Sequence, residues 1–375
     1  MLKKWKIIGL GLFFTLGTNF LYSANASSSA EFLTIDPNPR FDATGGAYTA
    51  SLTDISGMNI NPASTAFLRV PEVYINYKNI LQEFHHIYFS TGTPLGVFFR
   101  SRKSLPKRLR WLRKMRTGLS FQYLGTSDIE VVGNESNAVV NTISARDLAV
   151  SLGAGYNIRG YRIGGNIKVI NRKLADYTGT TFAFDLGVLK GFDVFRILPY
   201  PVRYNLRVGL AVLHIGPGVT FSNDQYKGDS QPLPLTVRPA VSYGIFGNRD
   251  HRVDFNFGLT YLLNEPFAFN TGVEYRVFNI FYLRLGGEIR TDEFNFTMGT
   301  GARYTFRKVT YRLDYSYLPR AHGIPDNHNV SLMATLSFIK VGKKKRVTSL
   351  GILEGYETKT NKKKKKKRRI KIKNR

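Results

Sequence analysis

The residues best suited to do chemistry are arginines that recur at every second position of strand-like segments. Arg284, Arg303 and Arg312 are examples, and Arg outnumbers Asp and Glu on the polar side of these segments. A guanidinium group forms paired hydrogen bonds with a carboxylate. If these side chains face into a tube, the lumen is electropositive and favours anionic or carboxylate-bearing solutes. The alternative, which we favour for most of them, is that they form ion pairs within the wall and with whatever fills the tube.

Arrangements of residues for catalysis or metal binding do not stand out. His85 and His86 are adjacent, so a strand points them to opposite faces, which is poor geometry for a shared metal ion. The sequence has no Gly-x-Ser-x-Gly, His-Glu-x-x-His or phosphate-binding glycine motif, and it has no cysteine. We therefore expect no enzymatic activity, no metal and no other cofactor.

A series of alternating segments positions the arginines. In 309–317, Val309, Tyr311 and Leu313 alternate with Arg312 and Asp314, which is the period of a β-strand. The candidate strands are 72–79, 84–92, 117–125, 145–157, 160–171, 179–190, 202–214, 234–246, 251–263, 266–277, 280–290, 294–306, 309–318 and 329–338. Their even number and their length of about nine to thirteen residues suit tilted strands that cross a bilayer. The prediction is an all-β fold, a 14-stranded antiparallel transmembrane β-barrel over 71–338, in preference to a soluble sandwich.

The lengths of the connections suggest an orientation. If the first strand starts in the periplasm, the tight connections at 157–160, 247–250, 278–279 and 307–308 are periplasmic, and the longer ones at 126–144, 215–233 and 319–328 lie outside. The connections at 93–116 and 191–201 are long although they would be periplasmic. Phe338 would end the last strand as the closing aromatic residue of the barrel.

A compact, turn-rich stretch precedes the strands. Residues 27–70 contain three each of Gly, Pro, Asn and Asp, without clean alternation or a long helical period. We predict that this stretch is a hatch packed inside the barrel. The residues expected to shape the hatch are Arg40, Gly45, Gly46, Asn61, Pro62 and Ala63.

The two ends of the chain have the composition of targeting and tail segments. Residues 1–26 begin with lysines, continue with an apolar run and close on Ala24-Asn25-Ala26, which predicts a cleaved secretory signal in preference to an uncleaved anchor. Residues 339–375 include eight successive basic residues from Lys362 to Arg369 and are expected to form a disordered periplasmic tail. Such a tail would meet anionic lipid or cell wall polymers, or simply be solvated.

The net charge of +28 does not indicate a nucleic-acid partner, because the charge is concentrated in two segments. The stretch from Lys340 to Arg375 holds 17 Lys and Arg, and Arg100 to Arg116 holds nine basic residues and no acid. In the second cluster Leu105, Leu109, Leu112 and Met115 recur at helical spacing beside Trp111, which is typical of an interfacial helix on anionic phospholipid. A solvated loop is the equal alternative.

Several motifs together resemble a known family. Phe32-Leu-Thr-Ile, Arg40, Gly45-Gly-Ala-Tyr-Thr-Ala50 and Asn61-Pro-Ala63 are similar to the N-terminal pattern of the PorV/PorQ-like proteins, which belong to the FadL group of outer-membrane barrels. Further resemblance lies in Leu213-His-Ile-Gly-Pro-Gly218, Leu233-Pro-Leu235, Arg238, Tyr311-Arg-Leu-Asp-Tyr315 and His328-Asn-Val-Ser-Leu332. Asp42-Ala-Thr44, Ser64-Thr65 and the Lys-rich tail depart from the pattern.

The resemblance implies a fourteen-stranded barrel in the cell outer membrane with an N-terminal hatch. FadL itself takes up long-chain fatty acids, and PorV relatives serve protein secretion. The first hypothesis is therefore passage of hydrophobic or amphipathic small molecules, with Arg284, Arg303 and Arg312 as candidate contacts for a ligand carboxylate. The second is a component of protein secretion or surface attachment that has no transport pore and binds secretion-system proteins. A third, structural role would tether the membrane to the cell wall through the tail.

Overall fold

Fourteen of the described strands form one closed antiparallel ring, which confirms the predicted barrel. The computed structural model describes residues 28–80, 84–99, 106–126, 129–132, 139–143, 145–194, 204–247, 250–291, 293–319 and 325–337. The predicted signal segment, the basic tail and Phe338 lie outside these residues.

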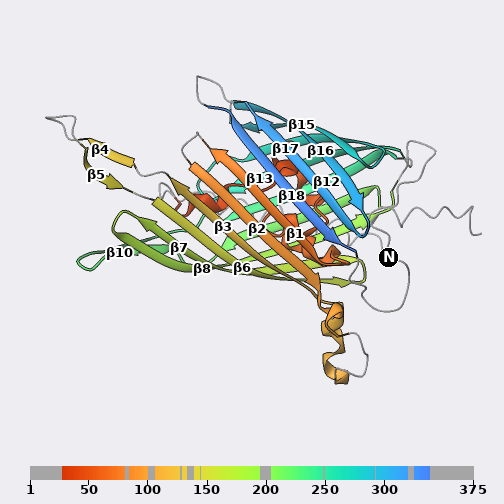
Figure 1. Ribbon diagram of the computed structural model, residues 1–375, viewed down its shortest axis with the longest axis horizontal. Coiled ribbons are helices and arrows are strands. Elements are labelled where there is room, and N and C mark those ends of the chain that lie inside the picture. The colour runs from red at the N-terminus through yellow and green to blue at the C-terminus, as the bar shows by residue number, and fades with distance from the viewer. Residues whose placement is uncertain are drawn as a thin grey trace, which may run out of the picture.

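Each predicted barrel strand has a counterpart, with ends that differ by a few residues. The ring consists of β1 (Glu72–Ile80), β2 (Phe84–Pro94), β3 (Arg116–Thr126), β6 (Ala145–Ile158), β7 (Tyr161–Leu174), β8 (Tyr177–Phe192), β9 (Leu206–Ile215), β12 (Thr236–Gly247), β13 (His251–Leu262), β14 (Ala268–Val277), β15 (Phe281–Arg290), β16 (Glu293–Phe306), β17 (Val309–Leu318) and β18 (Asn327–Leu336). Neighbours in the ring are neighbours along the chain, and the pairing of β18 with β1 closes it. Figure 1 shows the strands crossing the barrel obliquely.

The alternation along each strand separates an apolar outer face from a polar inner face. In β15, Leu283 and Leu285 are more than half exposed, whereas Arg284 between them and Tyr282 before them are buried. The same outward exposure recurs around the ring, at Ile75, Ile87, Leu119, Leu152, Ile167, Leu186, Phe257, Phe269, Phe296, Leu313 and Leu332. A continuous apolar collar of this kind is unfavourable in water and is solvated by hydrocarbon in a membrane. No helix among the described residues is long and apolar enough to cross a bilayer.

Two of the long connections contain short strands that the prediction did not include. The expected loops at 126–144 and 215–233 contain short strands, namely β4 (Ile129–Val132) with β5 (Val139–Ile143), and β10 (Val219–Ser222) with β11 (Lys227–Gln231). Strands of four or five residues are too short to cross a bilayer, so a search for bilayer-length alternation does not detect them.

Tight connections also occur at both ends of the barrel. The Arg159-Gly160 turn has positive φ at both residues, as a two-residue hairpin requires. It joins β6 to β7 at the end where β1 begins, whereas the equally short connection from β7 to β8 lies at the opposite end. Connection length alone therefore does not separate the two ends.

Between residue 28 and β1, the described chain forms short helical turns and no strand. They are η1 (Glu31–Thr34), α2 (Pro39–Asp42), η2 (Ala47–Ala50), η3 (Ile55–Gly57) and η4 (Pro62–Phe67). We call residues 28–70 the luminal segment. A further unit, η5 (Leu95–Val97) with η7 (Lys107–Lys114), lies between β2 and β3 and turns away from the wall at their ends (Figure 1).

Candidate functional site: the luminal segment and the inner wall

The luminal segment contacts strands all around the ring. Turn η3 contacts β1 and β2, η4 contacts β3, β6, β7 and β8, η2 contacts β9, β12, β13 and β14, and α2 contacts β16, β17 and β18. A segment can reach all these strands only from within the barrel, where Figure 1 shows its red and orange turns. The inner wall and this segment together form the candidate site.

Three residues with short polar side chains start helical turns in the luminal segment. The side chains of Asn38 and Asn61, each followed by proline, accept hydrogen bonds from the backbone N–H two residues later, at 3.0 and 3.1 Å. Asp54 accepts in the same way from the Ser56 N–H at 3.2 Å. These caps satisfy backbone donors that the lumen would otherwise bury unpaired. The Asn-Pro of the predicted hatch motif thus has a local structural role.

Gly45 and Gly46 allow the closest approach between the luminal segment and the wall. Both have positive φ, +59° and +82°, which favours glycine. A Cβ at Gly45 would collide with the backbone of Gly287, and a Cβ at Gly286 on the wall would collide with the Thr44–Gly45 backbone.

The other predicted hatch motif meets a second glycine-lined part of the wall. A Cβ at Gly164 would collide with the Pro62 carbonyl, and one at Gly187 would collide with the Asn61 side chain. Ala63 lies between them and is completely buried. Inward-facing glycines therefore receive the luminal segment at two places along it.

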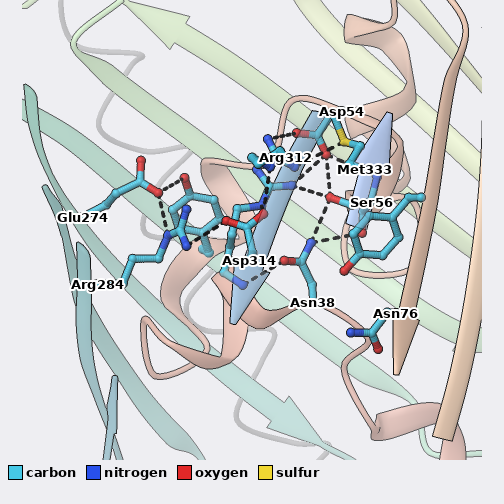
Figure 2. Close-up of polar contacts among 12 residues, drawn as sticks. Asn38, Asp54, Ser56, Asn76, Glu274, Arg284, Arg312, Asp314 and Met333 are labelled. Atoms are coloured by element: carbon cyan, nitrogen blue, oxygen red, sulfur yellow. Dashed lines mark hydrogen bonds and ion pairs between the residues drawn. The ribbon is translucent and has the colours of Figure 1, made fainter. Parts of the chain in front are cut away.

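A buried cluster of three arginines and three carboxylates joins the luminal segment to β14, β15 and β17 (Figure 2). Its members are Arg40, Asp54, Glu274, Arg284, Arg312 and Asp314. The Arg40 guanidinium contacts Asp54 at 2.7 Å, and Arg312 lies 3.2 Å from Asp54 and 2.8 Å from Asp314. Three formal positive charges face three negative ones, as charges removed from water require.

Arg284 links Glu274 to the rest of this cluster. Its fully buried side chain contacts Glu274 at 2.8 Å and Asp314 at 3.0 Å. Glu274 also accepts a 2.8 Å hydrogen bond from the Tyr48 hydroxyl, which adds a second link to the luminal segment. The guanidinium that we expected to meet a ligand carboxylate therefore contacts two protein carboxylates.

The ion pairs continue along the inner wall. Arg276 bridges Glu274 and Asp254 at 3.5 and 3.8 Å, and Asp254 also contacts Arg252 at 2.6 Å and Arg207 at 3.7 Å. A connected row of ion pairs thus runs from β17 through β15, β14 and β13 to β9. This agrees with the interpretation of most luminal arginines as structural.

The Asp54 carboxyl shows the electrostatic result. Burial by itself raises the pKa of a carboxyl, but the Arg40 and Arg312 guanidiniums outweigh burial and hold the pKa of Asp54 well below its ordinary value. Asp54 is therefore charged at neutral pH and holds the luminal segment to β17.

A different environment surrounds the start of the luminal segment. Phe32 and Leu33 of η1 are buried in an apolar cluster formed with strands β6, β7 and β8, with β10 and with the chain before β12. The buried members of this cluster are Ala30, Phe32, Leu33, Ala149, Ile170, Ala183, Val219 and Leu233. The polar contacts of η1 in this region include the Phe32 carbonyl, which accepts a 2.9 Å hydrogen bond from the Gln122 amide.

A buried polar group stands beside this apolar cluster. Lys168 pairs with Asp185 at 3.0 Å, and its ammonium lies 3.1 Å from Nδ1 of His214. Asp185 also accepts a 2.9 Å hydrogen bond from the His214 N–H, where the β8–β9 register shifts and His214 has φ of +62°. The group thus holds an irregular join in the barrel wall.

The predicted ligand contacts are not brought together as one site. Arg284 and Arg312 both contact Asp314, while Arg303 lies half-buried on β16, where it pairs in register with Arg312. Sequence reasoning missed Asp54 as the partner of Arg312.

His85 and His86 point to opposite faces. His85 contacts the Tyr77 hydroxyl at 2.8 Å on the outside, and His86 contacts Gln122 at 3.1 Å in the lumen. Within the part of the chain that the structure describes, no group of three or more His, Asp or Glu side chains could hold a metal ion.

A closed antiparallel barrel with an apolar outer face and a polar inner face has the architecture of the outer-membrane barrel proteins. More particularly, the chain belongs to the uncharacterised protein family UPF0164, whose sequence pattern matches residues 23–341. No curated protein matches the sequence.

Solved structures of similar shape include a toluene transporter, a FadL homologue and a hydrocarbon channel. The toluene transporter TbuX of Ralstonia pickettii has 12% identity and a TM-score of 0.49 over 80% of this chain and 98% of that one. A FadL homologue of Pseudomonas aeruginosa has 9% identity and a TM-score of 0.46 over 80% and 98%. The monoaromatic hydrocarbon channel TodX, as its deltaS2 mutant, has 11% identity and a TM-score of 0.48 over 79% and 96%.

Proposed function

We propose that this protein lies in the outer membrane, binds hydrophobic or amphipathic small molecules inside its barrel and passes them across, with the luminal segment as a movable hatch. The observation that carries the proposal is the apolar cluster around Phe32 and Leu33. It is one of several apolar clusters inside the barrel and the one formed by the start of the luminal segment, and ligand sites for hydrophobic molecules have this apolar character.

The occupant of this apolar space is the beginning of the luminal segment itself. Phe32 and Leu33 lie close to the start of the described chain, and their cluster contains none of the residues that pair with Asp54. Displacing η1 therefore exposes apolar wall to a ligand without breaking the buried arginine cluster. Long-chain fatty acids and monoaromatic hydrocarbons are the ligand classes to test first, since both supply the apolar surface that Phe32 and Leu33 now supply.

Full passage requires a larger movement than displacement of η1. The remaining turns of the luminal segment contact strands around the ring and would have to leave or rearrange. In this proposal, ligand bound in place of η1 weakens the hold of the wall on the rest of the segment.

A locking experiment tests the proposal. The chain has no cysteine, so a pair introduced by Ala47→Cys and Gly258→Cys reports on the segment alone. A Cβ at Gly258 would lie 3.6 Å from Cα of Ala47, which is within reach of a disulfide. Cells that carry the oxidised pair should lose uptake of labelled ligand, and reduction should restore it.

Each single cysteine variant serves as the control and should take up ligand as the parent does. Equal uptake by cells with and without the gene would refute transport. Undiminished uptake by the oxidised pair would refute the role of the luminal segment as a hatch.

The second candidate is a surface or secretion component similar to PorV. The specific observation in its favour is that the luminal segment is held by buried ion pairs and by backbone contacts at glycines. A barrel closed in this way can display a binding surface without conducting. Co-purification of protein partners together with unchanged solute uptake would support this candidate over the first.

A further inference from the structure

The η5–η7 unit between β2 and β3 is rooted firmly in the barrel end. The Leu95 N–H donates to the Met115 carbonyl at 3.0 Å, which closes the base of the unit. Arg116 donates to the Leu68 carbonyl at 3.2 Å and to the Lys114 carbonyl at 2.5 Å. The unit is therefore tied both to β3 and to the end of the luminal segment.

The unit projects to the side of the barrel. In Figure 1 it leaves the ends of β2 and β3 and turns away from the wall, at the end of the barrel where β1 begins. The apolar collar reaches close to this place, since Leu119 on β3 is 47% exposed only a few residues from η7. A segment that leaves the wall there runs along the boundary of the surrounding bilayer.

The side chains of the unit combine exposed apolar groups with cations. Phe98, Leu109 and Trp111 are 68%, 40% and 51% exposed. Five of the eight residues of η7 are Lys or Arg, in the sequence KRLRWLRK. Residues 84–127 contain no Asp or Glu, so the positive charge of this stretch is not balanced within it.

These properties match an anionic membrane surface. Large apolar side chains on a basic helix bury their rings and methyl groups at the headgroup boundary, while Lys and Arg meet lipid phosphates. Attraction to anionic lipid increases with each basic residue held near the surface. A solvated loop would not hold a tryptophan, a leucine and a phenylalanine exposed together on a rooted helical unit.

We propose that η5–η7 is a binding site for anionic phospholipid, with Phe98, Leu109 and Trp111 among the acyl chains and the η7 cations on the phosphates. The lipid belongs to the leaflet at the end where β1 begins. With the orientation expected from the sequence, this is the periplasmic leaflet. The proposal does not depend on what the lumen transports.

The test uses Trp111 as its own reporter. The chain has two tryptophans, Trp5 and Trp111, so a full-length Trp5→Phe protein emits from Trp111 alone. The folded barrel is placed in nanodiscs of phosphatidylcholine or of phosphatidylcholine with phosphatidylglycerol, and one of the two lipids carries brominated acyl chains. We expect emission at shorter wavelength and quenching several-fold stronger by brominated phosphatidylglycerol than by equally abundant brominated phosphatidylcholine.

Charge variants distinguish a preference for anionic lipid from simple insertion of Trp111 into any lipid. Arg108→Gln, Arg110→Gln and Arg113→Gln together should bring the two lipids to equal quenching while Trp111 stays shielded. Arg159→Gln is the matched control, because Arg159 is an exposed basic residue in a tight turn at the same barrel end, and it should leave the selectivity unchanged. Heat-modifiable migration in gels verifies that each variant is folded.

Three outcomes would overturn the proposal. Water-like emission without quenching by either lipid would show that the unit is solvated. Equal quenching by the two lipids in the parent protein would exclude selectivity for anionic lipid. A shift of Trp111 emission with periplasmic extract, and none with any lipid, would assign the surface to a protein partner.

Discussion

The two sides of the lumen hold the luminal segment by different physical means. Toward β13–β17, Asp54, Arg312, Asp314 and Arg284 form buried ion pairs that fix positions and directions. Toward β6–β8, Phe32 packs into an apolar cluster that has few directional contacts. Burial of apolar surface depends on area and tolerates exchange of one apolar group for another, whereas a buried charge requires its own partner.

This difference indicates which side can change occupant. A hydrophobic ligand can replace Phe32 and Leu33 with little change in the wall. Nothing but another anion can replace Asp54 or Asp314 beside the arginines. We call the β13–β17 side, held by buried charges, the fixed side, and the β6–β8 side, held by apolar packing, the exchangeable side. The following substitutions test that contrast.

The largest effect is expected from Asp314→Leu. Asp314 contacts Arg284 at 3.0 Å and Arg312 at 2.8 Å, so its loss leaves buried positive charge without compensation. Removing one partner of a buried pair costs about 3–5 kcal/mol. Urea titration of the barrel in vesicles should show this loss of free energy of unfolding, together with protease cleavage in the luminal segment. An unchanged urea midpoint would mean that the fixed side is not fixed by charge.

A smaller loss is expected from Gly164→Ala, which tests space and not charge. The new methyl group would meet the Pro62 carbonyl, and overpacking of this kind costs about 1–3 kcal/mol. Gly165→Ala is the matched control, since a Cβ there has no neighbour closer than the Asp185 carbonyl oxygen at 3.3 Å. If both variants unfold at the same urea concentration, close backbone contact at Gly164 is not what holds η4.

The sequence allowed the wall to be predicted because each strand repeats one local rule. In β15, the alternation of Leu283 and Leu285 outside with Arg284 inside can be recognised within one segment. The same alternation of apolar and polar residues located all fourteen strands of the ring. The short hairpin of β4 and β5 has no such run and was missed.

The contacts of the luminal segment could not be predicted in the same way. Asp54 and Arg312 are 258 residues apart, and nothing local in either sequence selects the other as its partner. One signal was nevertheless present in the sequence. Gly155, Gly164 and Gly187 fall at inward positions of successive strands, where a polar side chain is otherwise usual. They indicate close approach of another backbone, which is the stretch from Asn61 to Ala66.

On the exchangeable side, Ile170→Val should cost less. Ile170 is completely buried in the Phe32 cluster, and loss of one methylene from a core costs about 0.5–1.5 kcal/mol. Because the space is apolar, the same change should leave ligand uptake intact or increase it. Ile170→Asn has similar size but puts an amide into the cluster, and it should reduce uptake. Equal uptake of ligand by the two variants would show that the apolar cluster has no role in transport.

The smallest effect is expected from an ion pair outside the lumen. Arg290 contacts Glu265 at one end of β15, and their side chains are 26% and 44% exposed. Water screens such a pair, and side-chain entropy opposes it, so Glu265→Gln should change the free energy of unfolding by less than about 1 kcal/mol. The same chemical pairing thus differs in effect between the rim and the lumen because only the lumen removes both charges from water. A loss as large as that of Asp314→Leu, measured in the same urea titration, would show that burial is not what distinguishes the fixed side.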